Sequence, residues 1–284
     1  MTTIILLFFF ALGTIVGSFL NVIVLRHGAQ GLNGRSKCLS CGKTLSWFEL
    51  LPLFSFLVQK GRCLGCKGSI SIQYPLVELI TGLVFFGVAW KESSLILSSL
   101  SLPSTFYLLL SLCFWSLLIA ISVYDFRHKI IPDRLVYGAI FVSFFLFLYS
   151  YFILHTSYFF DFWVGFLIAA PFALLWFFSS GRAMGLGDAK LVVLFPWLLG
   201  FAKGLSALIV GFWIGAAFAL GALLLKAFLP FLSNILSPNY KMKLSALGPK
   251  TELPLGPFLV FGLFLVYLFG WDVTGLDQLL AVSF

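Results

Sequence analysis

The sequence is poor in charge: Asp, Glu, Lys and Arg make up only 10% of its 284 residues, and it has three histidines. Hydrophobic residues make up 61% of the chain, including 35 Phe, and the mean hydropathy is +1.08. A soluble domain needs a largely wettable exterior, so this composition excludes an ordinary soluble globular protein. The chain is therefore predicted to be an integral membrane protein.

The apolar residues gather in runs of about 20, the length that lets an α-helix cross the hydrocarbon of a bilayer. We therefore expect an all-α polytopic membrane protein with about eight transmembrane helices. The run at 189–202 is short and contains Pro196, so its ability to cross is marginal. The expected spans are 4–25, 74–90, 105–124, 135–154, 162–178, 189–202, 205–225 and 253–271.

The net charge of +8 is unevenly placed along the chain. If the first helix enters with its N-terminus outside, all of the 18 Lys and Arg except Lys91 and Lys203 fall on the cytoplasmic side. This matches the positive-inside rule and accounts for the charge without a nucleic acid partner. The bilayer is the partner that this pattern predicts.

Residues 26–73 form the one polar, loop-rich segment, and they contain two Cys-x-x-Cys pairs. Four thiolates at this spacing can converge on one zinc ion, which would be structural because no coordination position stays open for water. Disulfides seldom persist in the cytosol, and so small a segment with few apolar residues is not expected to fold without its metal. We expect a first helix at 1–25, a cytoplasmic zinc domain at 26–73 and a seven-helix domain at 74–284. The expected zinc ligands are Cys38, Cys41, Cys63 and Cys66.

Two aspartates stand at the ends of apolar runs, where a charged group is costly and commonly functional. Asp125 closes the third run, and Asp188 lies in the loop Gly185-Leu-Gly-Asp-Ala-Lys-Leu191. Two predicted crossings separate them, and an even number of crossings returns the chain to the same face. Gly185 and Gly187 are expected to permit unusual backbone angles and a close approach of another segment.

Two carboxyl groups about 3 Å apart cannot both ionise cheaply, so such a pair holds one shared proton near neutral pH. The ionised member can take a proton from water while the protonated member polarises a peptide carbonyl. The pair therefore predicts an intramembrane aspartyl protease that cuts at the cytoplasmic membrane boundary.

Smaller features have structural interpretations. Gly13 and Gly17, four residues apart in the first helix, favour close packing against another helix. Glu78 follows Tyr74-Pro75 at a helix start, where its charge suits the positive end of the helix dipole. Asp161, in an outside turn, is also expected to be structural.

Several motifs, in order along nearly the whole chain, resemble those of the type IV prepilin peptidases, which also act as N-methyltransferases. They are Gly17-Ser-Phe-Leu-Asn-Val22, the paired cysteines with Gly61-Arg62, Ile70 to Glu78, Asp125 through Ile131-Pro132-Asp133, Gly185 to Leu191, and Gly256-Pro257-Phe258.

The resemblance implies that Asp125 and Asp188 are the catalytic pair and that the substrate is a prepilin or pseudopilin. It also implies methylation of the new N-terminus by S-adenosylmethionine, with Gly61 and Arg62 serving that reaction. The expected location is the bacterial inner membrane, with the zinc domain and the active site facing the cytoplasm.

Three alternatives stay open at this stage. Departures from the family pattern at Leu39, Leu50 and Gln73 fall in the cytoplasmic domain, so a peptidase that has lost methylation is one alternative. A proton-coupled transporter would use the aspartates as a relay, although such carboxylates usually lie near the bilayer midplane. A zinc-bearing adapter without chemistry is the third.

Overall fold

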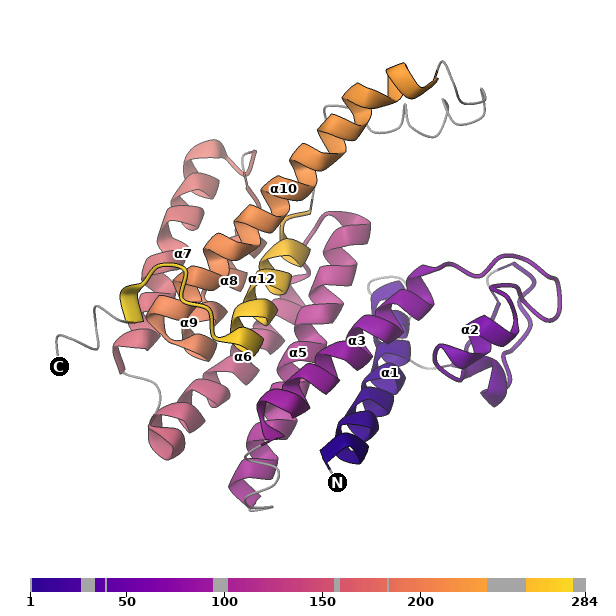
Figure 1. Ribbon diagram of the computed structural model, residues 1–284, viewed down its shortest axis with the longest axis horizontal. Coiled ribbons are helices and arrows are strands. Elements are labelled where there is room, and N and C mark those ends of the chain that lie inside the picture. The colour runs from indigo at the N-terminus through magenta and orange to yellow at the C-terminus, as the bar shows by residue number, and fades with distance from the viewer. Residues whose placement is uncertain are drawn as a thin grey trace. The chain divides into compact units, whose positions relative to one another are not determined.

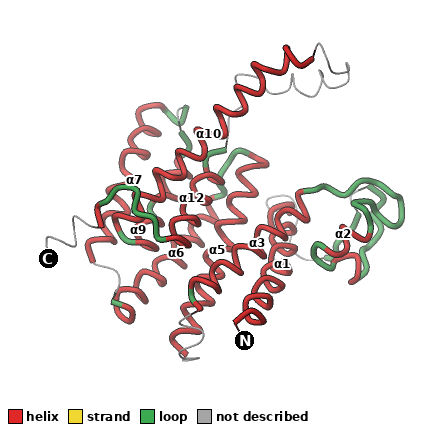
Figure 2. Tube along the Cα trace, in the orientation of Figure 1, coloured by secondary structure: helices red, strands yellow, loops and turns green. Residues whose placement is uncertain are grey.

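A computed structural model describes residues 2–26, 34–38, 40–93, 102–155, 159–182, 184–233 and 254–277, with the side chains of the last turns of helix α10 left out after residue 225. Within these ranges the regular structure is helical, apart from two isolated β-bridges (Figure 1 and Figure 2). The all-α class is thus confirmed. The elements are α1 Thr2–Arg26, η1 Trp47–Leu50, α2 Phe54–Val58, α3 Gln73–Lys91, α5 Leu102–His128, α6 Asp133–Tyr149, η2 Ser150–Leu154, α7 Phe159–Ser179, α8 Leu186–Val192, α9 Leu194–Leu199, α10 Phe201–Ser233 and α12 Gly256–Phe269.

Six of the helices in the described residues are long and apolar enough to cross a membrane, so the chain is a multi-pass membrane protein. Two of the eight expected spans are shorter than predicted. Helix α12 has 14 residues, or about 21 Å of helix, against a hydrocarbon thickness of about 30 Å. The expected span at 189–202 is divided between α8 and α9.

The division between α8 and α9 has a local cause. Pro196 has no N–H to donate to the carbonyl of Val192, and its ring crowds that carbonyl. The hydrogen-bond pattern of the α-helix is interrupted at Val193, between the two short helices, although the backbone angles of this residue stay helical. Pro196 therefore limits the length of α8, the helix that contains Asp188.

The chain divides into two compact units. The first comprises Met1–Tyr124 with Asp133–His155, and the second comprises Asp125–Pro132 with Thr156–Phe284. All four paired cysteines belong to the first unit. Both boundary aspartates belong to the second unit.

In the first unit, α1 packs closely on α3. A Cβ on Gly13 would lie 2.7 Å from the carbonyl oxygen of Thr81, and a Cβ on Gly17 would lie 2.8 Å from the Cα of Glu78. Real Cβ atoms do not approach so closely, and the predicted close packing through these two glycines is confirmed.

Glu78 does not cap its own helix, which corrects the sequence interpretation. It is the sixth residue of α3 and is buried. Its Oε2 atom accepts the backbone N–H of Leu53 at 2.8 Å. A residue read as a helix cap thus connects the cysteine-containing segment to α3.

In the second unit, α10 and α12 pack through a pair of glycines. A Cβ on Gly262 would lie 2.5 Å from the backbone nitrogen of Gly211. The backbones of the two helices are therefore in direct contact. Such close contact is how membrane helices pack in the absence of a hydrophobic driving force between them.

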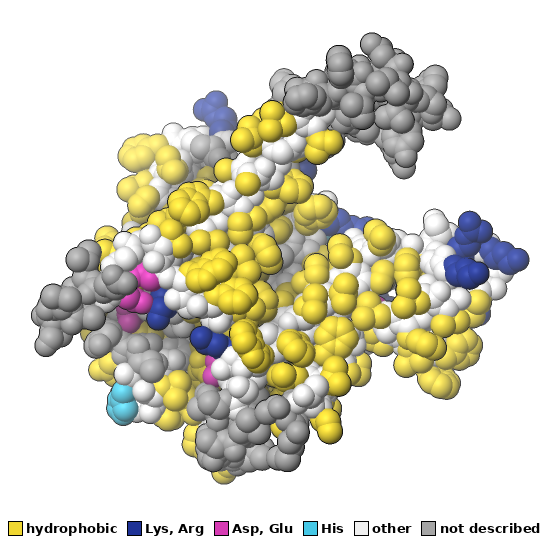
Figure 3. All heavy atoms as spheres, in the orientation of Figure 1, with side chains coloured by type: hydrophobic (Ala, Val, Ile, Leu, Met, Phe, Trp, Pro, Cys, Tyr) yellow, Lys and Arg dark blue, Asp and Glu magenta, His cyan; other side chains and the backbone are white. Residues whose placement is uncertain are grey.

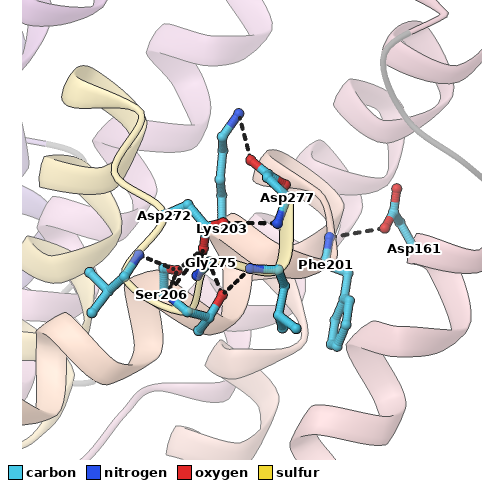
Figure 4. A network of polar contacts seen from close by, with 10 residues as sticks. Asp161, Phe201, Lys203, Ser206, Asp272, Gly275 and Asp277 are labelled. Carbon is cyan, nitrogen blue, oxygen red and sulfur yellow. Dashed lines mark hydrogen bonds and ion pairs between the residues drawn. The ribbon is translucent and has the colours of Figure 1, made fainter. Parts of the chain in front are cut away.

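A polar network fixes the end of this helix pair (Figure 4). Asp272 Oδ1 accepts the Ser206 hydroxyl at 3.2 Å and the backbone N–H and hydroxyl of Thr274 at 3.1 and 2.6 Å. Nearby, Asp161 Oδ1 accepts the N–H of Phe201, the first residue of α10, at 3.0 Å. The structural role expected of Asp161 is confirmed: it binds the start of α10.

Candidate active site and metal centre

Asp125 lies near the end of α5 and is 5% exposed. Its Oδ2 atom accepts the backbone N–H of Gly256 at 3.1 Å in a buried hydrogen bond. A Cβ on Gly256 would lie 2.7 Å from the same oxygen. The start of α12 therefore orients the Asp125 carboxyl group, and only glycine allows this approach.

Asp188 lies in the first turn of α8, and its side chain is also buried. The helix begins after Gly185, whose backbone is extended with φ −75°. That angle is open to any residue, so the expectation of unusual backbone angles is wrong at Gly185. The expected close approach holds at Gly187, where an added Cβ would lie 2.6 Å from the Cβ of Ile131.

Ile131 connects the surroundings of the two aspartates. Its side chain packs against Gly187, next to Asp188, and its Cδ1 would lie 3.6 Å from a Cβ on Gly256. Gly256 in turn binds Asp125. The end of α5, the start of α8 and the start of α12 thus meet around one isoleucine.

The two carboxyl groups are close enough to influence each other electrostatically. Burial, together with the neighbouring charge of Asp125, raises the pKa of Asp188 to about 6. The two crossings predicted between Asp125 and Asp188 correspond to the segments 133–154 and 159–179, which are both candidate membrane spans. This arrangement can hold a proton on one carboxyl group and offer the other as a base.

Sequence reasoning did not find the role of Gly256. The Gly-Pro pair at the start of α12 signalled a helix start, since proline is favoured in the first helical turn. Nothing in the spacing indicated that its N–H meets a carboxylate 131 residues away.

The four paired cysteines form one cluster. Their sulfur atoms all lie within 4.8 Å of one another, and the Sγ atoms of Cys38 and Cys66 are 3.9 Å apart. Four sulfurs at about 2.3 Å from a tetrahedral zinc would be about 3.8 Å from each other. The cluster therefore fits a metal ion of this size.

The two cysteine pairs have the same backbone geometry. Cys38 N–H donates to the carbonyl of Lys43, and Cys63 N–H donates to that of Gly68, both at 2.9 Å. A second backbone hydrogen bond closes each turn: Gly42 N–H donates to the carbonyl of Cys38, and Lys67 N–H donates to that of Cys63. Backbone hydrogen bonds from residues 41 and 40 lower the pKa of Cys38 to about 6. The pKa of Cys66 is raised to about 11, because a backbone hydrogen bond at Gly68 that lowers it is outweighed by burial and by side-chain hydrogen bonds to Cys41, Cys38 and Cys63.

Gly61 and Arg62 precede the third cysteine. Gly61 has φ +67°, and a Cβ there would lie 3.0 Å from the ring of Phe56, so the fold itself requires glycine. Arg62 is exposed and lines an open hollow of about 500 Å³. The other residues of the hollow are Gln59, Lys60, Cys63, Leu64 and Lys67.

Comparisons with known proteins agree with this arrangement. Residues 11–92 match the bacterial Peptidase A24 N-terminal domain, and residues 112–220 match the type IV leader peptidase family. No solved structure matches significantly.

Relatives from several bacteria bear the name prepilin leader peptidase/N-methyltransferase. The protein from Pseudomonas putida is 28% identical over 92% of this chain and 90% of its own length. That from Bacillus subtilis is 29% identical over 83% and 82%. The match with the Myxococcus xanthus protein, at 40% identity, covers 44% of this chain and only 35% of that protein. By both matched segments and these relatives, the chain belongs to the type IV leader peptidase family and has that family's bacterial N-terminal domain.

Proposed function

We propose that this chain is a prepilin leader peptidase and N-methyltransferase in which Asp125 and Asp188 cleave the peptide bond. The observation that supports this most directly is the buried pair itself. Two buried carboxyl groups, one near the end of α5 and one in the first turn of α8, influence each other electrostatically. Burial of a carboxyl group is costly, and a buried pair with a raised pKa is typical of groups that do chemistry.

The raised pKa of Asp188 assigns the roles within the pair. Burial and the neighbouring charge of Asp125 raise the pKa of Asp188 to about 6, so we propose that Asp188 holds the proton of the pair and Asp125 acts as the carboxylate. Asp125 takes a proton from water as the water oxygen attacks the peptide carbonyl, and Asp188 donates to the carbonyl oxygen. The C–N bond then breaks as the leaving amine takes the proton from Asp125, and a hydroxyl group of the tetrahedral intermediate returns a proton to Asp188. The Gly256 N–H holds the Asp125 carboxyl group in position throughout.

The proposed substrate is a type IV prepilin or pseudopilin with its cut site beside an apolar helix. The proposed location is the bacterial plasma membrane, with the aspartates and the cysteines facing the cytoplasm. Basic residues support this orientation because they cluster at 26–67 and beside both aspartates, at Arg127, Lys129 and Lys190.

We assign methylation of the new N-terminus to the cysteine-containing domain, residues 26–73. This keeps the division proposed from the sequence, with a first helix at 1–25 and a membrane domain at 74–284. S-adenosylmethionine would supply the methyl group. Its carboxylate suits the three cations that line the hollow, Lys60, Arg62 and Lys67, and Arg62 can bind such a group in bidentate fashion. Gly61 sets the turn that presents Arg62.

The proposed metal is a structural zinc ion bound by the four clustered cysteines. Four sulfur ligands complete a tetrahedron and leave no position for a reacting water molecule. The metal would therefore hold the two turns together, including the turn in which Arg62 lies.

Processing of a purified prepilin by Asp125→Asn and Asp188→Asn variants tests the peptidase assignment. Each variant should lose leader cleavage, while Asp133→Asn, an exposed carboxylate on the following helix, should retain it. Cleavage by both active-site variants at the wild-type rate would contradict the assignment.

The mass of the mature product tests methylation separately. With S-adenosylmethionine present, the wild-type product should gain one methyl group, and Arg62→Ala should cleave normally but leave the product unmethylated. An unmethylated wild-type product would favour a peptidase that has lost methylation.

A further inference from the structure

The segment Trp47–Val58 comprises η1, α2 and the turn between them. It exposes apolar side chains and buries its charged one. Every exposed side chain between residues 46 and 59 is hydrophobic, and Trp47 is 76% and Leu57 72% exposed. Solvated domains rarely gather so many large apolar side chains in one patch. The exposed residues are Trp47, Phe48, Leu50, Leu51, Phe54, Leu57 and Val58.

The charge of this segment points inward. Its one charged residue, Glu49, is buried, accepts Lys43 Nζ at 3.1 and 3.3 Å, and accepts the Ser46 N–H at 2.9 Å. A segment with its carboxylate inside and its aromatic side chains outside is suited to apolar surroundings. This also revises the expectation that the segment 26–73 is poor in apolar residues: they are present, but on its surface.

A hydrogen bond sets the depth of the segment relative to a membrane helix in the same unit. Leu53, between η1 and α2, donates its N–H to Glu78 at 2.8 Å. Glu78 is the sixth residue of α3, a candidate span, so it lies about 7.5 Å along the helix axis from the first residue. The segment Trp47–Val58 is therefore held level with the first turns of a membrane-spanning helix.

The rest of the domain provides the complementary charge. Lys43, Lys60, Arg62 and Lys67 are exposed, and Glu49 is the only acidic residue from 34 to 72. Figure 3 shows hydrophobic side chains along one edge of this domain and basic side chains at another. An apolar face with tryptophan beside lysine and arginine is typical of segments that lie in the interface of an anionic bilayer.

We propose that Trp47–Val58 inserts its apolar face into the interfacial region of the bilayer and so anchors the cysteine-containing domain to the membrane surface. We infer that lipid covers the apolar face. The segment lies level with the first turns of α3, its domain is basic, and α1 and α3 connect the domain to the membrane at both ends. The anchor would keep the domain at the level where a membrane-bound substrate emerges.

A photoreactive residue tests what covers the face. Benzoylphenylalanine is placed at Phe54 or Leu57 of the full chain in nanodiscs with anionic lipid, and at Ser69 as a control. Ser69 is exposed on the same domain but outside the segment. Lipid adducts should be several-fold more frequent at 54 and 57 than at 69. A zinc content equal to that of the wild type shows that the cysteine-containing domain of each variant is folded.

Three results would overturn the proposal. Lipid adducts equally frequent at 57 and 69 would mean that the face does not meet lipid. Replacement of lipid adducts by adducts to an added prepilin would assign the face to the substrate, and crosslinked dimers would assign it to a second copy.

An independent measurement uses Trp47 itself. Brominated lipids quench tryptophan that lies within the bilayer, and the difference between wild type and Trp47→Phe isolates the Trp47 contribution. That contribution should be strongly quenched. An unquenched Trp47 emission would show that the side chain lies in water and would contradict the insertion.

Discussion

At the scale of single residues, the candidate active site depends on the absence of a side chain at Gly256. The site of a Cβ at this position is 2.7 Å from Asp125 Oδ2, where the backbone N–H donates its hydrogen bond. A methyl group there must displace the carboxyl group or the start of α12. Small displacements of a catalytic group are expensive because reaction requires a near-attack geometry.

Gly256→Ala should therefore reduce leader cleavage by about 100-fold, the scale expected for a displacement of about 1 Å. Gly221→Ala is the matched control, because a Cβ at Gly221 would meet nothing within 4 Å. The measurement is the cleavage rate of a purified prepilin. Equal rates for the two variants would show that Gly256 does not position Asp125.

Asp188 is predicted to cost the protein stability. Its folded pKa of about 6 lies above its ordinary value of 3.8, so the folded state binds the proton more tightly than the unfolded state does. The contribution of Asp188 to stability is therefore most favourable below about pH 4 and is lost as the pH rises through about 6. Two pKa units correspond to about 3 kcal/mol.

Asp188→Asn should be inactive but more thermostable than the wild type at pH 7. The difference in melting temperature should shrink as the pH is lowered from 6 to 4, which thermal unfolding in detergent at a series of pH values would measure. A variant less stable than the wild type at pH 7 would contradict this account.

At the scale of elements, short helices and close helix pairs position the site. Helix α8 ends after seven residues because Pro196 interrupts the segment, so Asp188 lies in a short helix rather than within a long span. Helix α12 lies against α10 through Gly211 and Gly262. The register of this pair places Gly256, and therefore its N–H, at Asp125.

Gly262→Ala should destabilise the protein by about 1–3 kcal/mol, the usual cost of overpacking. Gly215→Ala on the same face of α10 should be milder, because its Cβ would lie at an ordinary 3.5 Å from Phe258. Melting temperatures in detergent compare the two. Similar losses for both variants would indicate that the α10–α12 contact is not tight at Gly262.

At the scale of the whole molecule, the chain divides its chemistry between two units. The four cysteines and Arg62 belong to one unit, and Asp125, Asp188 and Gly256 belong to the other. Each set is complete within its own unit. The two activities should therefore respond differently to damage in the cysteine cluster.

Cys41→Ser should prevent binding of the proposed zinc ion and abolish methylation, because a small metal domain loses its fold with its metal. Leader cleavage should decline less, since both aspartates lie in the other unit. Zinc content by elemental analysis and product mass give the two readouts. A cleavage loss as large as the methylation loss would show that the cysteine domain also supports proteolysis.

Much of this organisation could be predicted from the sequence because it depends on local pattern. Run length and hydropathy predicted membrane helices, and cysteine spacing predicted one cluster from Cys38 to Cys66. The even number of crossings predicted that Asp125 and Asp188 would lie at one face. These features follow from composition and from distances counted along the chain, which the sequence contains in full.

Only the tertiary structure decided which groups touch. The contacts of Gly256 with Asp125, of Ile131 with Gly187 and of Leu53 with Glu78 join residues that are far apart in the chain. A periodic pattern shows that a residue faces a neighbour, but it does not show which neighbour or how near. Those distances depend on backbones that approach until a single Cβ would not fit, and this closeness arises only when the helices pack.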